Sequence, residues 1–384
     1  METTASSAAH RDLRDWLDRV EEIGLLMRIK AEVDWDEEMA AISHMVGQEQ
    51  SAPALLFETI RGYPREFRAL WNLLGGSVPR IALALGEPHD LDVMELIQRC
   101  KVKFGRSIPP VFVEPDEAPV NANHLRDSAV DVTVFPAPRH WPLDGGRYIG
   151  TADAIITRDP DGGWLNVGCY RQMVQDRNHV GLYLSPGKDA RLHIEGYWRR
   201  NEPCELVAVW GVDPTMFIVA SQSFPKTVSE MDFIGGITGR PVELVKGAAG
   251  SIPYPARAEI VVEGVISPNV QKLEGPFGEF TGYYGRPEDL AFLMEIKVIH
   301  YRDDPILTNT LTTDTGMLYA VARSARIWGD LDRLGVPGIR GVYCHPAAAG
   351  AFGMTVISLE QRYAGHAPQV LALAAQCRGG AYFT

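Results

Sequence analysis

Cysteine is scarce in this sequence, and long hydrophobic runs are missing. The 384 residues include five cysteines, at positions 100, 169, 204, 344 and 377, which are odd in number and far apart. Neither a disulfide framework nor a zinc site with Cys-x-x-Cys spacing fits this pattern. No segment approaches the roughly 18 apolar residues of a membrane span, and the N-terminus lacks the basic and then apolar regions of a signal peptide. These absences predict a cytoplasmic protein without a membrane span.

Positive charge is also in short supply. Lys and Arg number 37 against 49 Asp and Glu, which gives a formal net charge of −12. This balance argues against nucleic acid as a partner, because binding to phosphate backbones depends on concentrated Lys and Arg. With 46% hydrophobic and 22% charged residues, the composition is typical of a globular protein. At roughly 150 residues per domain, the length allows two to three domains.

Helices alternate with short strands in the first 125 residues. Apolar residues recur at helical spacing over residues 12–29, and a second helix is predicted over residues 37–48. Apolar runs at residues 54–57 and 69–74 predict strands, because Gly and Pro punctuate the chain beside them. This alternation predicts an N-terminal α/β segment.

Strand periodicity dominates the middle of the chain. Apolar and polar residues alternate there, as they do in strands with one buried face, and one helix interrupts them. The predicted strands are residues 148–156, 204–210, 216–219, 258–266 and 291–301, and the predicted helix is residues 229–235. A β-barrel or a sandwich-like unit would bury the apolar face of these strands.

The α/β pattern returns after residue 311. Helices are predicted over residues 320–334 and 367–377, with strands between them at residues 341–344 and 354–359. The chain therefore ends in a second α/β segment.

Two glycine-containing segments have some features of phosphate-binding motifs. Residues 186–189 contain a Gly-Lys pair but lack the upstream Gly and the Ser or Thr of a P-loop, and residues 235–239 lack Rossmann spacing. We interpret both segments as turns. A nucleoside triphosphatase or an ordinary nicotinamide dehydrogenase therefore has little support.

The most informative segment is residues 273–284, LEGPFGEFTGYY. Glu274 and Glu279 are five residues apart and do not share a helical face, and Pro276 prevents a regular helix. The segment is therefore a shaped loop that can direct both carboxylates at one cavity. There, unequal environments could keep one carboxylate ionised and let the other act as a general acid. Chemistry alone leaves open the alternative of a turn with solvated glutamates.

Further candidate residues lie in the middle of the chain. Asn166 and Arg171 belong to the segment NVGCYR, in which the guanidinium could bind a carboxylate or a phosphate. Asn166, His193 and Glu230 could supply oxygen and nitrogen ligands to a divalent cation. No fixed spacing supports this site, so solvated or structural roles stay open. Cys169 is either a nucleophile or a buried thiol.

In order and spacing, these segments resemble the UbiD family of prenylated-flavin-dependent decarboxylases, and the resemblance extends over nearly the whole chain. The segments that carry it are residues 53–58, 72–86, 144–146, 166–171, 229–230, 259–264, 274–284 and 363–367. The resemblance implies an α/β (α+β) fold with three parts. These are an N-terminal α/β domain (1–125), a central split β-barrel of the flavin reductase-like type that binds the flavin (126–310), and an incomplete C-terminal α/β domain (311–384).

The resemblance also implies roles for individual residues. Arg171, Glu274 and Glu279 correspond to the family's Glu-Arg-Glu catalytic network, in which Glu279 is the proton donor. A second set looks like the residues that hold Mn²⁺, with K⁺ as a further ion, against the flavin phosphate; these are Asn166, His193 and Glu230. The implied flavin contacts are Asn166, Cys169, Tyr170, Arg171, Lys188, His193, Ser221, Gln222 and Glu230.

The implied reaction is a reversible, non-oxidative decarboxylation of an aromatic, heteroaromatic or α,β-unsaturated carboxylic acid with prenylated FMN. Loss of CO₂ from such a carbon leaves a carbanion that side chains alone do not stabilise, so the cofactor must act as the electron sink. The implied partners are the small acid, a flavin prenyltransferase and further copies of the chain in a homodimer or larger homo-oligomer. Two alternatives stay open: a flavin reductase-like FMN oxidoreductase and a catalytically silent flavin-binding subunit.

The length of the chain differs from that expected for this family. Family members usually continue beyond the position at which this chain stops, Thr384, whereas every catalytic and cofactor motif precedes it. The comparison predicts two complete domains and part of a third. For a 384-residue product, we expect weakened stability, oligomerisation and active-site closure.

Overall fold

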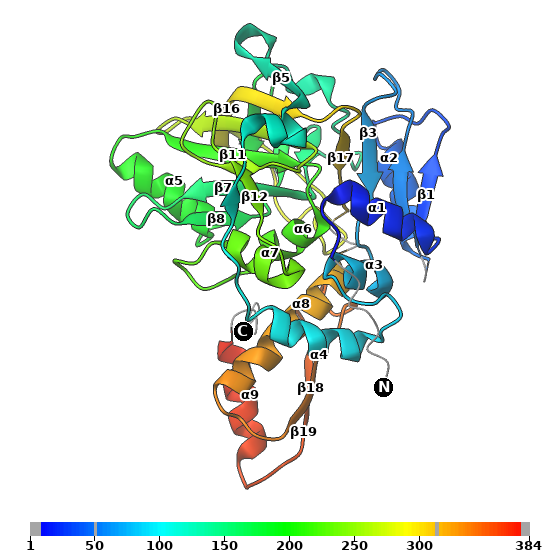
Figure 1. Ribbon diagram of the computed structural model, residues 1–384, viewed down its shortest axis with the longest axis vertical. Coiled ribbons are helices and arrows are strands. Elements are labelled where there is room, and N and C mark those ends of the chain that lie inside the picture. Colours follow the sequence, from blue (N-terminus) through cyan, green and yellow to red (C-terminus); the bar gives the residue numbers. More distant parts are fainter. Residues whose placement is uncertain (1–8, 50–51, 312–314, 378–384) are drawn as a thin grey trace.

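The computed structural model describes residues 9–49, 52–311 and 315–377. The N-terminal elements lie beside a large central sheet, and the last helices and a hairpin extend from one end of the molecule (Figure 1). The first elements along the chain are α1 (Leu13–Glu22), β1 (Leu26–Ile29), α2 (Glu38–Gly47), β2 (Ala54–Phe57), β3 (Arg68–Trp71), α3 (Val78–Ala84) and α4 (Val93–Lys103). Among the described residues, no helix combines the length and the apolar character that crossing a membrane requires.

A small sheet organises the N-terminal region, with the strand order β1-β2-β3-β17, where β17 is Ile306–Thr308. The helix predicted over residues 37–48 and the strand at 54–57 are confirmed. The helix predicted over residues 12–29 is wrong beyond Glu22. The chain turns at Gly24, whose φ is 70°, and residues 26–29 pair in parallel with β2. This non-local pairing outweighs the local helical spacing, because it satisfies the backbone hydrogen bonds of the segment.

In the described part of the chain, the central sheet contains ten strands. Its path runs β6-β9-β10-β16-β14-β11-β7-β8, and β15 and β5 both pair with β16. Its strands are β5 (Asn123–Arg126), β6 (Tyr148–Gly150), β7 (Asp153–Arg158), β8 (Leu165–Gly168), β9 (Gln172–Val174), β10 (His179–Leu182), β11 (Cys204–Trp210), β14 (Ile260–Ile266), β15 (Gln271–Glu274) and β16 (Asp289–Tyr301). The curled sheet and the mixture of helix and strand confirm the predicted α/β class.

Short elements connect this sheet to the N-terminal region. Three short strands form a separate small sheet: β4 (Val111–Phe112), β12 (Glu243–Val245) and β13 (Tyr254–Pro255). Four 3₁₀ turns lie between β4 and β6, at Pro115–Glu117, Pro119–Ala122, Asp127–Ala129 and Val132–Val134. Because β17 pairs with β3, residues 306–308 belong to the N-terminal sheet. The division at residues 125 and 310 stays a proposal.

Three helices pack on the central sheet: α5 (Asp189–Arg199), α6 (Pro214–Ala220) and α7 (Glu230–Thr238). The strand predicted over residues 216–219 is wrong, because this run lies inside α6. Asp213 caps α6 by accepting hydrogen bonds from the backbone N–H groups of residues 215 and 216, and Pro214 occupies the first turn. Every residue of α6 is buried, so its sequence shows no polar face from which helical periodicity could be recognised.

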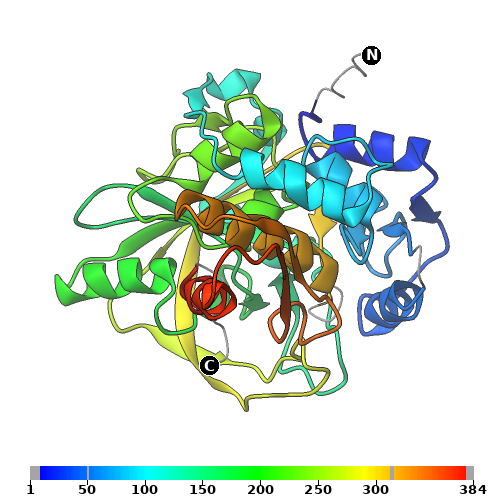
Figure 2. The ribbon, with the colours of Figure 1, turned by 90° about the horizontal axis from the view of Figure 1, so that it is seen from below.

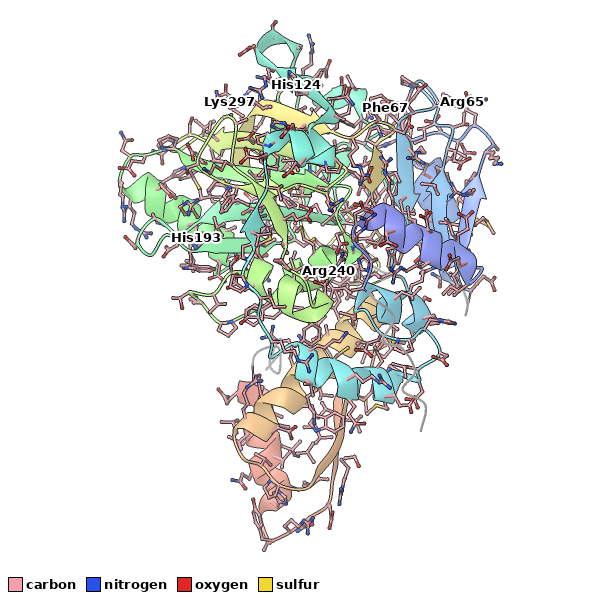
Figure 3. All side chains as sticks on the ribbon, in the orientation of Figure 1. Arg65, Phe67, His124, His193, Arg240 and Lys297 are labelled. Carbon is pink, nitrogen blue, oxygen red and sulfur yellow. The ribbon has the colours of Figure 1, made fainter. Side chains whose placement is uncertain are left out.

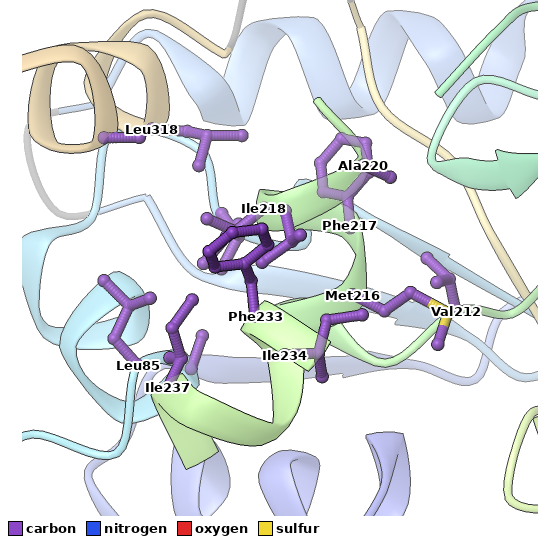
Figure 4. Packing of buried hydrophobic residues seen from close by; sticks show 14 of the residues in the cluster. Leu85, Val212, Met216, Phe217, Ile218, Ala220, Phe233, Ile234, Ile237 and Leu318 are labelled. Carbon is purple, nitrogen blue, oxygen red and sulfur yellow. The ribbon is translucent and has the colours of Figure 1, made fainter. Parts of the chain in front are cut away.

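The extent of α7 corrects the interpretation of residues 235–239 as a turn. Gly235 and Gly236 lie within α7, and Gly239 ends the helix, so only the end of this segment is a turn. A Cβ at Gly236 would lie 2.2 Å from the carbonyl oxygen of Arg106, and one at Gly235 would lie 2.4 Å from that of Ile108. The glycines therefore allow the chain to approach α7 closely. In the packing around α7, Phe233 lies beside Ile218 of α6, and Ile237 lies beside Leu85 (Figure 4).

The C-terminal elements are α8 (Gly316–Arg333), β18 (Ile339–Cys344), β19 (Thr355–Leu359) and α9 (His366–Gln376). They confirm the order predicted after residue 311. Strands β18 and β19 form an antiparallel hairpin, and α8 runs between α4 and α9 (Figure 2). The start of α8 and the turn between the two strands reach the candidate active site.

Candidate active site

Arg171, which follows β8, lies at the centre of a network of two glutamates. Its Nε and Nη2 donate to Oε1 and Oε2 of Glu274 at 2.8 and 3.0 Å, and its Nη1 donates to Oε1 of Glu279 at 2.8 Å. Two parallel hydrogen bonds to one carboxylate fix the plane of a guanidinium. The structure therefore brings together the three residues that the sequence singled out.

The two carboxylates occupy different environments. The side chain of Glu274 is 2% exposed, whereas that of Glu279 is 26% exposed. Glu274 also accepts a hydrogen bond of 2.9 Å from the Tyr148 hydroxyl, and burial raises the pKa of this hydroxyl. Glu274 is thus surrounded by donors and faces the protein interior. Glu279 keeps access to the cavity and is the carboxylate that can meet a bound molecule.

The segment 144–146 holds the loop between the two glutamates. One carboxylate oxygen of Asp144 accepts a hydrogen bond from the Gly278 backbone N–H at 3.1 Å. The Gly145 N–H donates to the carbonyl oxygen of Pro276 at 2.9 Å. A Cβ at Gly145 would lie 1.8 Å from the carbonyl oxygen of Gly275, so no larger residue fits there without moving the loop. These contacts give the Asp-Gly-Gly sequence a physical role.

A cavity of about 250 Å³ opens in front of Arg171 and Glu279. Its walls combine aromatic rings with hydroxyl groups and one lysine, and they come from the central sheet, α6, the 274–284 loop and the C-terminal region. The lining residues are Thr151, Cys169, Tyr170, Arg171, Tyr183, Ser185, Lys188, Phe217, Phe277, Glu279, Phe280, Thr310, Thr315, Tyr319, Gly350 and Phe352. The cavity therefore contains five of the predicted site residues.

Aromatic rings flank the guanidinium of Arg171. Its central carbon lies 4.4 Å from the ring centroid of Tyr183 and 5.1 Å from that of Phe277. Cation–π contacts of this kind stabilise a charged group that is partly removed from water. Together with the glutamates, they restrict Arg171 to one orientation at the cavity wall.

Cys169 is half-buried, and it contacts the buried carboxylate of Asp153 through its Sγ, at 3.2 Å. Burial, together with the Asp153 charge, raises the pKa of Cys169 well above its ordinary value. The side chain is therefore a protonated thiol and not an activated nucleophile, since the thiolate is the reactive form.

One of the three predicted metal ligands lies on β8, and the other two approach this strand from the helices α5 and α7. Asn166 lies on β8, beside Val167, whose backbone N–H donates to Oε2 of Glu230 at 2.8 Å. His193 points from α5 toward the sheet (Figure 3). Its Nδ1 lies 2.9 Å from the hydroxyl oxygen of Thr157, which pairs with Asn166 across the strands. Both helices thus bring their predicted ligands to the same strand.

Burial governs the chemistry of this set. It raises the pKa of Glu230 to about 7 and lowers the pKa of His193, so that the imidazole is held in the neutral form that binds metals. The amide nitrogen of Asn166 is buried without a hydrogen-bond partner among the described residues. A buried carboxylate and a buried amide both require compensation, which a cation and an anionic oxygen would supply.

The structure gives less support to the metal site and to two of the predicted flavin contacts. Within the described ranges, no group of three or more His, Cys, Asp and Glu residues has the arrangement of a metal site, so the proposed ligand set depends on the Asn166 amide. Ser221 and Gln222 do not line the cavity. Gln222 donates to the hydroxyl of Ser221 at 3.2 Å, and both follow Ala220, whose carbonyl oxygen accepts from the Cys169 N–H at 2.9 Å.

His140 lies behind the 274–284 loop, and its burial leads us to expect that acid lowers the stability of the fold. Its imidazole packs against Trp71 and Phe277, and burial lowers its pKa to about 3. The unfolded chain binds a proton there below pH ~6.5, whereas the folded chain does not. The free energy of unfolding should therefore fall as the pH drops from ~6.5 toward 3, by up to ~1.4 kcal/mol per pH unit.

Urea unfolding of the wild type and of His140→Leu between pH 7 and pH 4 tests this expectation. The variant lacks the titrating group, so its free energy of unfolding should fall less than that of the wild type as the pH falls. Parallel pH profiles of the two proteins would show that His140 is not held neutral by burial.

Several site residues escaped the sequence analysis. Tyr148 and Tyr183 are far from the glutamate loop in sequence, and Tyr319 and Phe352 come from the C-terminal region. No local pattern marks them. Phe277 and Phe280 belong to the segment already singled out, and their position between the two glutamates and beside Glu279 was a usable signal.

Comparisons with known proteins agree with this architecture. Three family models of 3-octaprenyl-4-hydroxybenzoate carboxy-lyase match the chain. The N-terminal domain matches residues 17–100, the Rift-related domain matches residues 111–315, and the C-terminal domain matches residues 316–384. The fold and these matches define a carboxy-lyase, an enzyme that removes or adds CO₂. The chain belongs to the UbiD family.

Several similar proteins carry the names of decarboxylases. The chain is 30% identical to the pyrrole-2-carboxylic acid decarboxylase of Pseudomonas aeruginosa, with 95% of this chain and 75% of that protein covered. It is also 30% identical to the phenolic acid decarboxylase of Sedimentibacter hydroxybenzoicus, with 94% and 76% covered. Among solved structures, the UbiD-class enzyme HmfF of Pelotomaculum thermopropionicum, in complex with prenylated FMN, aligns with a TM-score of 0.86 at 29% identity over 95% of this chain and 82% of that one. These comparisons support a flavin cofactor.

Proposed function

We propose that this enzyme is a prenylated-FMN-dependent decarboxylase of aromatic or heteroaromatic carboxylic acids, with α,β-unsaturated acids as the wider substrate class. The observation that carries this proposal is the position of Arg171 between a buried glutamate and a cavity-facing glutamate. The wider family supports the choice of substrate, because its named members act on pyrrole-2-carboxylic acid, phenolic acids and vanillic acid.

The residues around the cavity fit a flavin. Lys188 and Ser185 offer a cation and a hydroxyl to an anionic group, and the rings of Tyr183 and Phe280 offer flat apolar surfaces to a planar one. Cys169 and Tyr170 complete the wall beside Arg171. Prenylated FMN, when bound, would supply the electron sink that decarboxylation at an sp² carbon requires.

The side chains have distinct tasks in the proposed reaction. Arg171 binds the substrate carboxylate and compensates its charge, while Glu274 holds the guanidinium in plane. Glu279 lines the cavity and is partly exposed, so it can take up a proton from water and donate it to the carbon from which CO₂ departs. One proton replaces one CO₂, so the overall reaction is redox-neutral. The reverse reaction would use Glu279 as the base.

Asn166, His193 and Glu230 are proposed to hold Mn²⁺ against the flavin phosphate, with K⁺ as a further ion. Neutral imidazole and carboxylate oxygen are suitable ligands for Mn²⁺, and the cation would offset the cost of burying Glu230. The unpartnered amide nitrogen of Asn166 could donate to a phosphate oxygen.

Replacing Glu230 with Gln is expected to lower the manganese content of protein purified after co-expression with a flavin prenyltransferase by at least about tenfold. The reason is that the amide keeps the shape of the side chain and loses its charge. Elemental analysis by mass spectrometry measures this content. The control is Glu243→Gln, because Glu243 lies on β12 and pairs with Arg257. Equal manganese in both variants would contradict the assignment.

Co-expression with a flavin prenyltransferase tests the function as a whole. The purified protein should show a modified-flavin absorption spectrum and release CO₂ from at least one of pyrrole-2-carboxylic, vanillic and cinnamic acids. Nicotinamide-dependent flavin reduction without CO₂ release would favour an FMN oxidoreductase instead. Cofactor binding without turnover over a broad panel of acids would favour a silent flavin-binding subunit.

A further inference from the structure

A buried carboxylate lies directly behind the peptide that carries Arg171. Asp153, at the start of β7, is 0% exposed. Its Oδ1 accepts a hydrogen bond from Cys169 Sγ at 3.2 Å, and its Oδ2 accepts one from Gln172 Nε2 at 2.6 Å. The backbone N–H of Tyr170 also donates to this carboxylate. Asp153 therefore accepts hydrogen bonds from residues on both sides of Arg171.

The second contact is itself fixed from behind. Gln172 is fully buried, and its Oε1 accepts a hydrogen bond from Trp210 Nε1 at 3.2 Å. A Cβ at Gly150 would lie 2.4 Å from Gln172 Nε2, so the amide is closely packed. Trp210 is the direct cross-strand partner of Asp153. The Gln172 amide can therefore point its nitrogen only toward the carboxylate if both of its hydrogen bonds are to be kept.

Burying the Asp153 carboxylate costs desolvation free energy, and the packing of β7 does not depend on a carboxylate at this position. The donors to the Asp153 carboxylate are a thiol, an amide and backbone N–H groups, which are all neutral, and burial raises the pKa of the carboxyl group to about 7. An apolar residue in β7 would avoid the desolvation of a carboxylate. It could not, however, bind the three donors that surround Arg171.

We propose that Asp153 is a positioning residue, which fixes residues 169–172 so that Arg171 presents its guanidinium to Glu279 and to the substrate carboxylate. This inference deepens the proposed function and rests on it. Arg171 makes its three ion-pair hydrogen bonds at 2.8–3.0 Å, and hydrogen bonds weaken steeply when the geometry is lost. A displacement of about 1 Å at such a group can cost about 100-fold in rate.

Asp153→Asn tests the proposal, because an amide offers one acceptor where the carboxylate offers two and turns its NH₂ toward that of Gln172. Deuterium exchange of the apo-protein should become faster by at least about tenfold at the backbone amides of residues 169–172. In the cofactor-loaded enzyme, kcat should fall by at least about tenfold, with a smaller change in the dissociation constant of the flavin.

The paired variant Asp153→Asn/Gln172→Glu should restore both measurements. The new carboxylate at position 172 accepts from Trp210 and from the new amide at position 153, and the oxygen of that amide accepts from Cys169 and Tyr170. Recovery to within about threefold of the wild type is expected, since the hydrogen-bond complement is the same. Glu263→Gln is the matched control: Glu263 is another buried carboxylate of the central sheet, bonded to His300, and its loss should leave exchange at 169–172 unchanged.

The outcomes separate this inference from the proposed function. Wild-type exchange and kcat in folded Asp153→Asn, or no recovery in the paired variant, would overturn the positioning role. If Asp153→Asn does not fold, Gln172→Met removes one arm of the network while keeping the volume, and the same two changes are expected at smaller size. If the wild type decarboxylates no acid, the proposed function fails, while the exchange measurements still decide whether Asp153 fixes the segment.

Discussion

Glu279→Gln is expected to lower kcat for decarboxylation by at least about 100-fold while leaving flavin binding intact. The amide retains a hydrogen-bond acceptor for Arg171, which now donates to Glu279 at 2.8 Å, but it has no proton to give. General acid catalysis contributes about 10²- to 10⁴-fold to a rate, so kcat should fall within that range or further. Cofactor-loaded protein and CO₂ release with pyrrole-2-carboxylic or vanillic acid provide the measurement.

The matched control for this variant is Glu288→Gln. Glu288 is exposed and follows the same loop toward β16, so its substitution removes one carboxylate from the region without touching the cavity. Its kcat should stay within about twofold of the wild type. Full activity of Glu279→Gln, with the flavin bound, would show that another group or a water molecule delivers the proton.

Arg171→Lys is expected to cause the second large loss. A lysine keeps the charge but is a point donor, and it cannot make two parallel bonds to Glu274 and a third to Glu279. Removal of one oriented donor to a reacting group typically costs about 10²- to 10³-fold in kcat. The KM for the acid should rise as well, because Arg171 is proposed to bind the substrate carboxylate in the ground state. Steady-state kinetics of the loaded enzyme separates the two effects.

Arg177→Lys is the control for this substitution. Arg177 is exposed and paired with Asp131 at 2.9 Å, outside the cavity. Exposed ion pairs contribute little, so both kinetic constants should be close to those of the wild type. An Arg171→Lys enzyme with unchanged KM and a reduced kcat would restrict the role of Arg171 to the transition state.

Much of the fold was predictable because the signals are local. Runs rich in apolar residues predicted the long strands β11, β14 and β16 and the helix α8. In β16, buried and exposed residues largely alternate, as expected for a strand with one buried face. The errors share a cause. The strand predicted at 216–219 is a helix buried on all sides, and residues 26–29 leave their predicted helix to pair with β2. In both places tertiary contacts decide the structure.

The sequence by itself determined the family and the identity of the central charges. The segment 273–284 and Arg171 carry their meaning in residue type and order, because Gly and Pro prevent a helix and two carboxylates flank the turn. Only the tertiary structure decided which glutamate is buried and which faces the cavity. It also revealed the contact of Tyr148 with Glu274 and the support of the 169–172 segment by Asp153. These contacts join residues that are distant in the chain, and hydrogen bonds between such residues leave no period in a sequence.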